Sequence, residues 1–572
     1  MTIQTALRRS LRHGVLFACI GLALGTTTAY AQSAPSENAT VNLVRLLVKR
    51  GVLTQGDADA LIAQANTEAS QARAASAAVP VVAGAGTAGG QVRVQYVPEV
   101  VRNQIRDEVK QEVIAQAKTE HWAEPNALPE WLDRIGWSGD MRVRDEFHYY
   151  DKGNAYPVVD FAQLNRTGPY DLNSQNPPPL LNTRENRTNS LRIRARLGVT
   201  LTLGDTVTGG IRIGTGNDNN PVSTTQTLGG GLTKKELWLD QAYLTWKPAD
   251  WVAVTGGRMA NPFMSTNLLF ADDLNFDGVA SQFHVPVSDD VGAFATVGMF
   301  PIEYQADDFP TQAGLKSASR DKWLTAAQLG AKWKIDEDTS WKFALAYYRF
   351  DHLRGELSSP CSLYLGGNYC DTDSTRSSFM QKGNSLFLLR NIVPDPSSPG
   401  NYAQPQFVGL VYDYRLANAT TQFDMKVADT PLRLEGDYVR NMAYHRRDAF
   451  RDSVGLGRLV NNFDSGAFSA DTYKSGPVGW MMRATLGNPQ PSGSNDWNVV
   501  FGYKYLQPDA TVDGLNDPDF HLGGTNAKGF ILSGSYGISK YAWISARYFN
   551  SKEVFGPPLS IDVFQLEMNA RF

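Results

Sequence analysis

The segment that decides the fold reads SLRIRARLGVTLTL, from Ser190 to Leu203. Alternate residues are apolar, and the residues between them are Ser, Arg, Gly or Thr. Successive side chains of a β-strand point to opposite faces, so the pattern predicts a strand with one apolar and one polar, cationic face. The turn LGDT then leads to a second alternating segment that includes Ile211 and Ile213. Together the two segments predict a β-hairpin.

Segments of this kind recur along the chain, and the connections between them alternate in length. The short connections include KPADW (247–251) and ISKY (538–541), whereas 353–406 and 442–475 are long and polar. Short turns at one end and long loops at the other are typical of a transmembrane β-barrel. If both ends of the barrel lie at the short-turn end, the strand number must be even. We therefore predict an all-β, antiparallel transmembrane barrel over residues 131–572, with about 16 strands, or about 18 if one hairpin is hidden.

The two faces of the strands predict where lipid and water lie. The polar faces carry Arg, Lys, Glu and Gln in numbers that a dry interior would not tolerate, so we expect them to line a water-filled channel. The apolar faces then meet outer-membrane lipid. Aromatic residues near the predicted strand ends would form the interfacial girdles; these are Trp131, Trp137, Trp246, Trp251, Trp333, Trp341, Tyr541 and Trp543.

Composition excludes other classes of protein. The net charge of −4 argues against a nucleic-acid partner. Mean hydropathy is −0.31, and no internal apolar run reaches the length of about 18 residues that a membrane-spanning helix needs. The seven histidines are scattered without metal-ligand spacing, so we expect no metal and no cofactor.

The N-terminal quarter differs from the rest. Residues 1–31 read as a signal peptide, with three arginines, an apolar stretch and the cleavage site Ala29-Tyr30-Ala31. We expect a helical periplasmic segment over 32–70, an Ala/Gly-rich linker over 71–97, and a second periplasmic helix over 98–130. The apolar stripe of that helix leaves two alternatives open, a helix packed on its own chain or a coiled coil. In an exported protein, the cysteine pair Cys361 and Cys370 predicts a disulfide.

The last ten residues, VFQLEMNARF, alternate from Phe564 to Phe572. We expect Leu566, Met568 and the other apolar residues to face lipid, and Gln565 and Glu567 to face the lumen. This strand should close the barrel against the first strand, near residues 140–147.

Three stretches carry a resemblance to a known family. They are LLVKRGVLT…DADALI, VPEVVRNQIRDEVKQEV leading to LPEWLDRIGWSGDMRVR, and the terminal NARF. The chain resembles the putative porins of the Gram-negative outer membrane that carry a helical periplasmic extension. The resemblance implies a channel for passive diffusion of small hydrophilic solutes or ions, with the N-terminal helices in the periplasm. It also implies that Phe572 is the signal read by the barrel-assembly machinery, and it leaves room for a homotrimer.

The candidate permeation residues follow from the faces and from the resemblance. A basic wall would line the pore; its members are Arg142, Arg144, Arg192, Arg194, Arg196 and Arg212. Known porins oppose such a wall with an acidic loop folded into the lumen after the fifth strand. Here that position holds NPFMSTNLLFADDLNFDG (261–278), with Asp272, Asp273 and Asp277. The Pro-Glu-Phe-Gly signature of the trimeric general porins is absent, which leaves the inward fold open. The alternative is that the arginines are solvated and filter nothing.

Two other functions compete with the pore. The periplasmic helices could make the protein a structural tether or an oligomerisation stalk. A barrel hydrolase would need a serine and a histidine brought together at the lipid-facing surface, and no G-x-S-x-G motif is present. We expect a channel and not an enzyme.

Overall fold

The computed structural model describes residues 134–217, 220–306, 320–451, 454–464 and 468–572, together with positions 132 and 316. The predicted signal peptide, the two helical segments and the linker lie outside this part of the chain. No helix within it is both long and apolar enough to cross a membrane.

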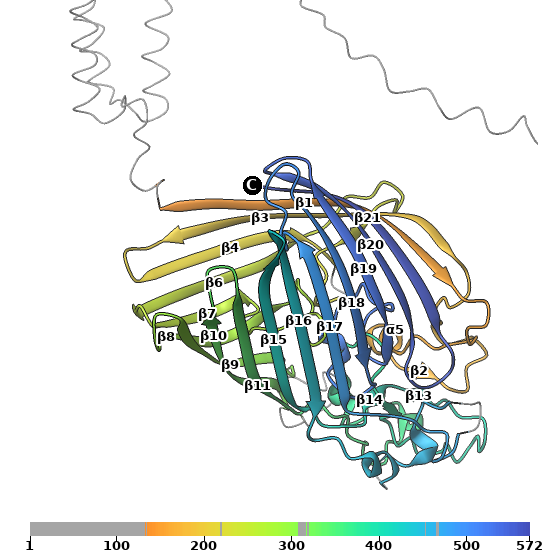
Figure 1. Ribbon diagram of the computed structural model, residues 1–572. Coiled ribbons are helices and arrows are strands. Elements are labelled where there is room, and N and C mark those ends of the chain that lie inside the picture. Colours follow the sequence, from red (N-terminus) through yellow and green to blue (C-terminus); the bar gives the residue numbers. More distant parts are fainter. Residues whose placement is uncertain are drawn as a thin grey trace, which may run out of the picture. The chain divides into compact units, whose positions relative to one another are not determined.

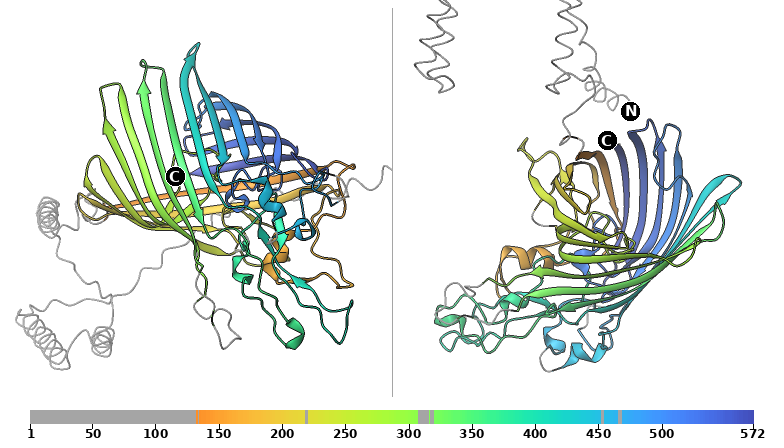
Figure 2. Two further views of the ribbon diagram at one scale, coloured as in Figure 1. Left: turned by 90° about the horizontal axis from the view of Figure 1, so that it is seen from below. Right: turned by 90° about the vertical axis from the view of Figure 1, so that its left-hand side faces the viewer.

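Sixteen long strands make up a closed antiparallel barrel in the described part of the chain (Figures 1 and 2). They are β1 (Ile135–Tyr150), β3 (Arg187–Thr202), β4 (Val207–Thr215), β6 (Leu237–Ala249), β7 (Val252–Ala260), β8 (Asn275–Pro286), β9 (Val291–Glu303), β10 (Lys322–Lys334), β11 (Ser340–Asp351), β15 (Arg415–Val427), β16 (Thr430–Asn441), β17 (Val478–Gly487), β18 (Trp497–Leu506), β19 (Ala527–Gly537), β20 (Ala542–Glu553) and β21 (Ser560–Arg571). The predicted count of sixteen is confirmed.

The remaining elements belong to the long connections. Helix α5 (Phe161–Thr167) and the small pairs β2–β13 (Tyr170–Asp171 with Pro405–Gln406) and β12–β14 (Leu386–Leu388 with Val408–Leu410) lie at the loop end of the barrel (Figure 1). Strand β5 (Gln226–Thr227) adds a short pairing to β3. Single 3-10 turns are η1 (Leu363–Leu365), η2 (Asp373–Thr375), η3 (Arg446–Phe450), η4 (Leu456–Arg458) and η5 (Asp513–Leu515).

The barrel closes where the sequence predicts. Strand β21 pairs with β1 from Asp140↔Arg571 to Tyr150↔Ile561, and with β20 on its other side. Leu566 and Met568 are 52% and 60% exposed, whereas Gln565 is fully buried. The alternating terminal segment therefore presents its apolar side outward and its polar side to the lumen, as predicted.

One side of the lumen is not lined by water. Inward-facing residues such as Phe300, Leu324 and Tyr348 join apolar residues of several connecting segments in one buried hydrophobic core. The expectation that the inward faces line water therefore fails at the loop end of this side, from β8 to β18, whereas nearer the short turns the inward residues of the same strands are polar, such as Lys342 and Gln422. The physical reason lies in strands such as β11, which carry apolar residues on both faces: Leu345 points outward and Tyr348 inward. At the loop end, the polar passage is left to the opposite side, along β1, β3, β4, β20 and β21.

Candidate functional site: a constriction of paired arginines and carboxylates

The connection between β7 and β8, residues 261–274, crosses the inside of the barrel; we call it the first lumen loop. Its Met264 exchanges two hydrogen bonds with the Gln328 side chain on β10, at 2.8 and 2.9 Å. Farther along, the Thr266 hydroxyl donates to Asp437 on β16 at 2.6 Å. The loop is thus fixed to strands far apart around the barrel.

The connection between β18 and β19, residues 507–526, also folds inward; we call it the second lumen loop. The Ala271 amide donates to the Leu515 carbonyl at 2.9 Å, and the Asn516 side chain donates to the Leu269 carbonyl at 3.2 Å. The alternation of short and long connections alone would make this segment one more outer loop. Its composition carried a signal, because residues 507–526 hold four aspartates and several apolar residues but no lysine or arginine.

Asp273 of the first lumen loop meets the predicted basic wall. Its carboxylate lies 2.8 Å from Arg196 and 3.1 Å from Arg194 on β3. Asp140 on β1 binds the same two arginines from the other side, at 2.7 and 2.9 Å. Burial raises the pKa of Asp273, but the positive charges of Arg194 and Arg196 outweigh burial and hold the pKa below its usual range.

Asp519 of the second lumen loop completes the other half of the wall. Arg144 on β1 is buried and lies 2.8 Å from Asp519 and 2.6 Å from Glu567 on β21. Arg547 on β20 reaches Asp519 at 3.0 Å. Burial raises the pKa of Asp519, whereas Arg144 and Arg547 lower it, so the carboxyl titrates well below its usual range.

The remaining wall arginines are paired as well. Arg192 lies 2.8 Å from Glu146, and Arg142 donates to Thr225 at 2.6 Å and lies 3.8 Å from Glu567. We define the arginine cluster as six arginines and the five carboxylates that they contact: Arg142, Arg144, Arg192, Arg194, Arg196 and Arg547 with Asp140, Glu146, Asp273, Asp519 and Glu567. Its formal charges nearly cancel.

Three of the predicted residues lie elsewhere. Arg212 forms its own pair with Asp240 of β6 at 2.6 Å. Asp272 is in the first lumen loop but is exposed, and the neighbouring arginines contact Asp273 instead. Placing Asp277 in the loop is wrong, because β8 begins at Asn275. The carboxylate of Asp277 pairs with Arg258 of β7 at 2.9 Å, on the outward face of the sheet.

A cavity of about 790 Å³ leads from the loop end toward the arginine cluster. Its wall comes from the connections after β1, β4, β11, β16, β18 and β20, and includes Phe161, Lys382 and Phe463. Arg192, Thr225 and Asp519 also line it, so the cluster borders this cavity directly. The arrangement places the arginine cluster at the inner end of this cavity, which we call the vestibule.

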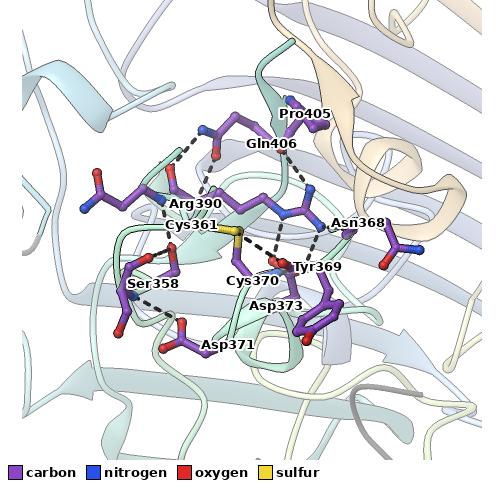
Figure 3. The surroundings of a disulfide bond; sticks show 12 residues. Ser358, Cys361, Asn368, Tyr369, Cys370, Asp371, Asp373, Arg390, Pro405 and Gln406 are labelled. Carbon is purple, nitrogen blue, oxygen red and sulfur yellow. Dashed lines mark hydrogen bonds and ion pairs between the residues drawn. A yellow bond between two sulfur atoms is a disulfide. The ribbon is translucent and has the colours of Figure 1, made fainter. Parts of the chain in front are cut away.

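The long connection between β11 and β15 carries a cross-link outside the lining of the vestibule. Cys361 and Cys370 form a disulfide, and the buried Arg390 lies beside it (Figure 3). Arg390 bonds to the Asp373 carboxylate at 2.6 and 2.8 Å and to the Pro405 carbonyl at 3.1 Å. These contacts join distant parts of the connection between β11 and β15.

The family follows from a comparison over nearly the whole chain. Residues 37–572 match the model of a family described as "Putative porin". The chain belongs to this family. It is an outer-membrane porin, and its barrel forms a channel. In such barrels the short turns face the periplasm and the long loops face outward, so the vestibule is extracellular.

Solved outer-membrane structures resemble the barrel at low sequence identity. The high-pH structure of Pseudomonas putida OprB shares 11% identity at a TM-score of 0.39, covering 77% of this chain and 96% of that one. The outer membrane channel DcaP of Acinetobacter baumannii shares 11% at 0.35, covering 77% and 97%. Salmonella typhi OmpF, in complex with daunomycin, shares 9% at 0.36, covering 77% and 97%. No curated protein matches the sequence.

Proposed function

We propose that this porin passes small hydrophilic solutes or ions by passive diffusion, and that the arginine cluster is its filter. The observation that carries the proposal is the set of ion pairs joining both lumen loops to β1, β3 and β20 below the vestibule. Charged side chains at a narrow passage are common filter chemistry. They favour a solute that can exchange hydrogen bonds with them and disfavour a lipophilic one that cannot.

Single-channel recording tests the filter. Changing Arg192, Arg194 and Arg196 together to Ala should alter both conductance and ion preference in planar bilayers. The matched control is Arg349→Ala, because Arg349 lies on the outward side of β11 and its ion pair among the described residues is with the nearby Asp351. Traces of the triple variant that match those of the control would overturn the filter role.

One group of described residues resembles the catalytic site that the hydrolase alternative would need. His521 lies 3.0 Å from the Ser551 hydroxyl and 3.5 Å from Glu553, which superficially resembles a catalytic triad. Ser551 also donates to the Ile561 carbonyl, and both Ser551 and His521 are fully buried. A nucleophile without access to substrate cannot act. We therefore propose that the group is structural and that the protein is a channel and not an enzyme; a lipase assay on purified protein in detergent should show no activity.

The partners stay predictions. We propose the barrel-assembly machinery as the partner of the terminal strand, a homotrimer as the assembly, and the periplasmic segment as a stalk or tether. Crosslinking of the purified protein in membranes would test the trimer through a band at three times the mass of the chain.

A further inference from the structure

Two lysines are neighbours on adjacent strands of the lumen wall, on the side of the barrel opposite the arginine cluster. Lys332 on β10 and Lys342 on β11 are register partners, so their side chains leave the same face of the sheet. This face is the inward one, because Gln328 and Tyr348 share it and are buried. Like charges directly opposite one another destabilise a strand pair.

Neither lysine takes part in an ion pair with another described residue, in contrast to the arginines. The next inward side chain in the same row is Gln422 of β15. The nearby carboxylate, Asp424, is already bound by Arg433 at 2.6 Å and by Gln422 at 2.6 Å. The two ammonium groups therefore place an uncompensated positive charge on the short-turn side of the first lumen loop.

An aromatic platform lies beside these charges. Phe294 of β9 pairs in register with Gly330 of β10, where an added Cβ would come within 2.2 Å of the Phe294 ring. The absent side chain lets the ring lie across the neighbouring strand. The Lys342 ammonium is 4.9 Å from the ring centroid, and the His284 ring stacks on Phe294 at 6.5 Å. A cation at this distance from a ring is held in place.

Both features border one pocket of about 480 Å³ between β8–β11 and the first lumen loop. Gln282 and Gln328 use their amides to hold the loop: they donate to the Pro262 and Met264 carbonyls at 3.0 and 2.9 Å. The loop thus forms a fixed roof, with Pro262 and Met264 turned into the pocket. The ammonium groups of the two lysines can therefore donate hydrogen bonds to a solute that enters the pocket.

We propose that this pocket binds small organic carboxylates with an apolar or aromatic body. Lys332 and Lys342 would bind the carboxylate, and Phe294, Met264 and Pro262 would contact the body. The site rests on the proposed channel function, since solute must reach it through the lumen. It adds these two lysines, which favour anions, to the contribution that the mostly paired arginine cluster makes to ion preference.

Current block by sodium benzoate in planar bilayers tests the site, with benzamide as the neutral probe of the same shape. In the full-length protein, benzoate should reduce the open-channel current saturably and benzamide should not. Changing Lys332 and Lys342 together to Gln should raise the half-blocking concentration by about tenfold or more, the loss expected for a charge-assisted hydrogen bond. The double variant should also move the reversal potential in a KCl gradient toward cation preference.

The matched control is Lys334→Gln, which removes a lysine from the same strand outside the pocket lining. The control should keep the block of the unmodified protein. Equal block by benzoate and benzamide, or unchanged block in the double variant, would overturn the site while leaving the channel function intact. If the unmodified protein forms no channels, the proposed function itself fails, which is a different result.

Discussion

At the scale of single residues, the pairing of the C-terminal residue with the first strand depends on a glycine. Gly139 of β1 exchanges two backbone hydrogen bonds with Phe572, at 3.1 and 3.2 Å. A Cβ at Gly139 would come within 2.5 Å of the Phe572 ring. Gly139→Val should therefore displace the terminal ring and destabilise the closed barrel by about 1–3 kcal/mol.

The measurement is the temperature at which the folded barrel loses its fast mobility on a denaturing gel. Gly136→Val is the control, because a Cβ at Gly136 meets nothing nearer than 3.8 Å. Equal melting of the two variants would show that the ring contact contributes nothing to closure.

A second residue-scale prediction concerns the pair in Figure 3. Arg390 and Asp373 are both almost fully buried, and removing one partner leaves the other charge without compensation. Asp373→Ala should destabilise the loop between β11 and β15 by about 3–5 kcal/mol. Trypsin should then cleave the loop readily. Asp371→Ala, at an exposed neighbouring carboxylate, should stay resistant, and cleavage of both variants at one rate would contradict the role of the pair.

At the scale of elements, the first lumen loop is held to β3 through Asp273. Asp273→Asn weakens the contacts with Arg194 and Arg196, so we expect noisier open-channel current. The adjacent Asp272→Asn, which makes no contact with these arginines, should leave the trace quiet.

Since the pKa of Asp273 is below the ordinary value of about 3.9, its stabilising contribution is fully present above that pH. It is lost only as the pH falls through the lower folded-state pKa, so the unmodified channel should stay quiet at pH 4.

The elements also show what sequence can and cannot predict. The strand β3 and the terminal strand are readable because lipid on one side and polar groups on the other impose a period of two. Where both faces of a strand are apolar, as in β11, the alternation does not show which face points inward. The sequence therefore does not reveal the buried core of the lumen. The second lumen loop went unseen for another reason. The contact between Ala271 and Leu515 joins positions far apart in the chain, and no local pattern encodes it. The arginines of β1 and β3 and the lumen-facing position of Glu567 were predictable, whereas their partner Asp519 on the second lumen loop was not.

At the scale of the whole molecule, the proposed filter is built from the barrel and its two inward loops. Every member of the arginine cluster lies between Asp140 and Glu567, and the barrel closes on itself through β1 and β21. A variant that keeps the signal peptide but lacks residues 32–120 should therefore form channels with the conductance of the full chain. If the N-terminal segment acts as a stalk, its loss should reduce the share of crosslinked trimer without changing the current of a single pore. Loss of all channel activity, with the barrel still folded by heat-modifiable mobility, would show instead that the segment takes part in the pore.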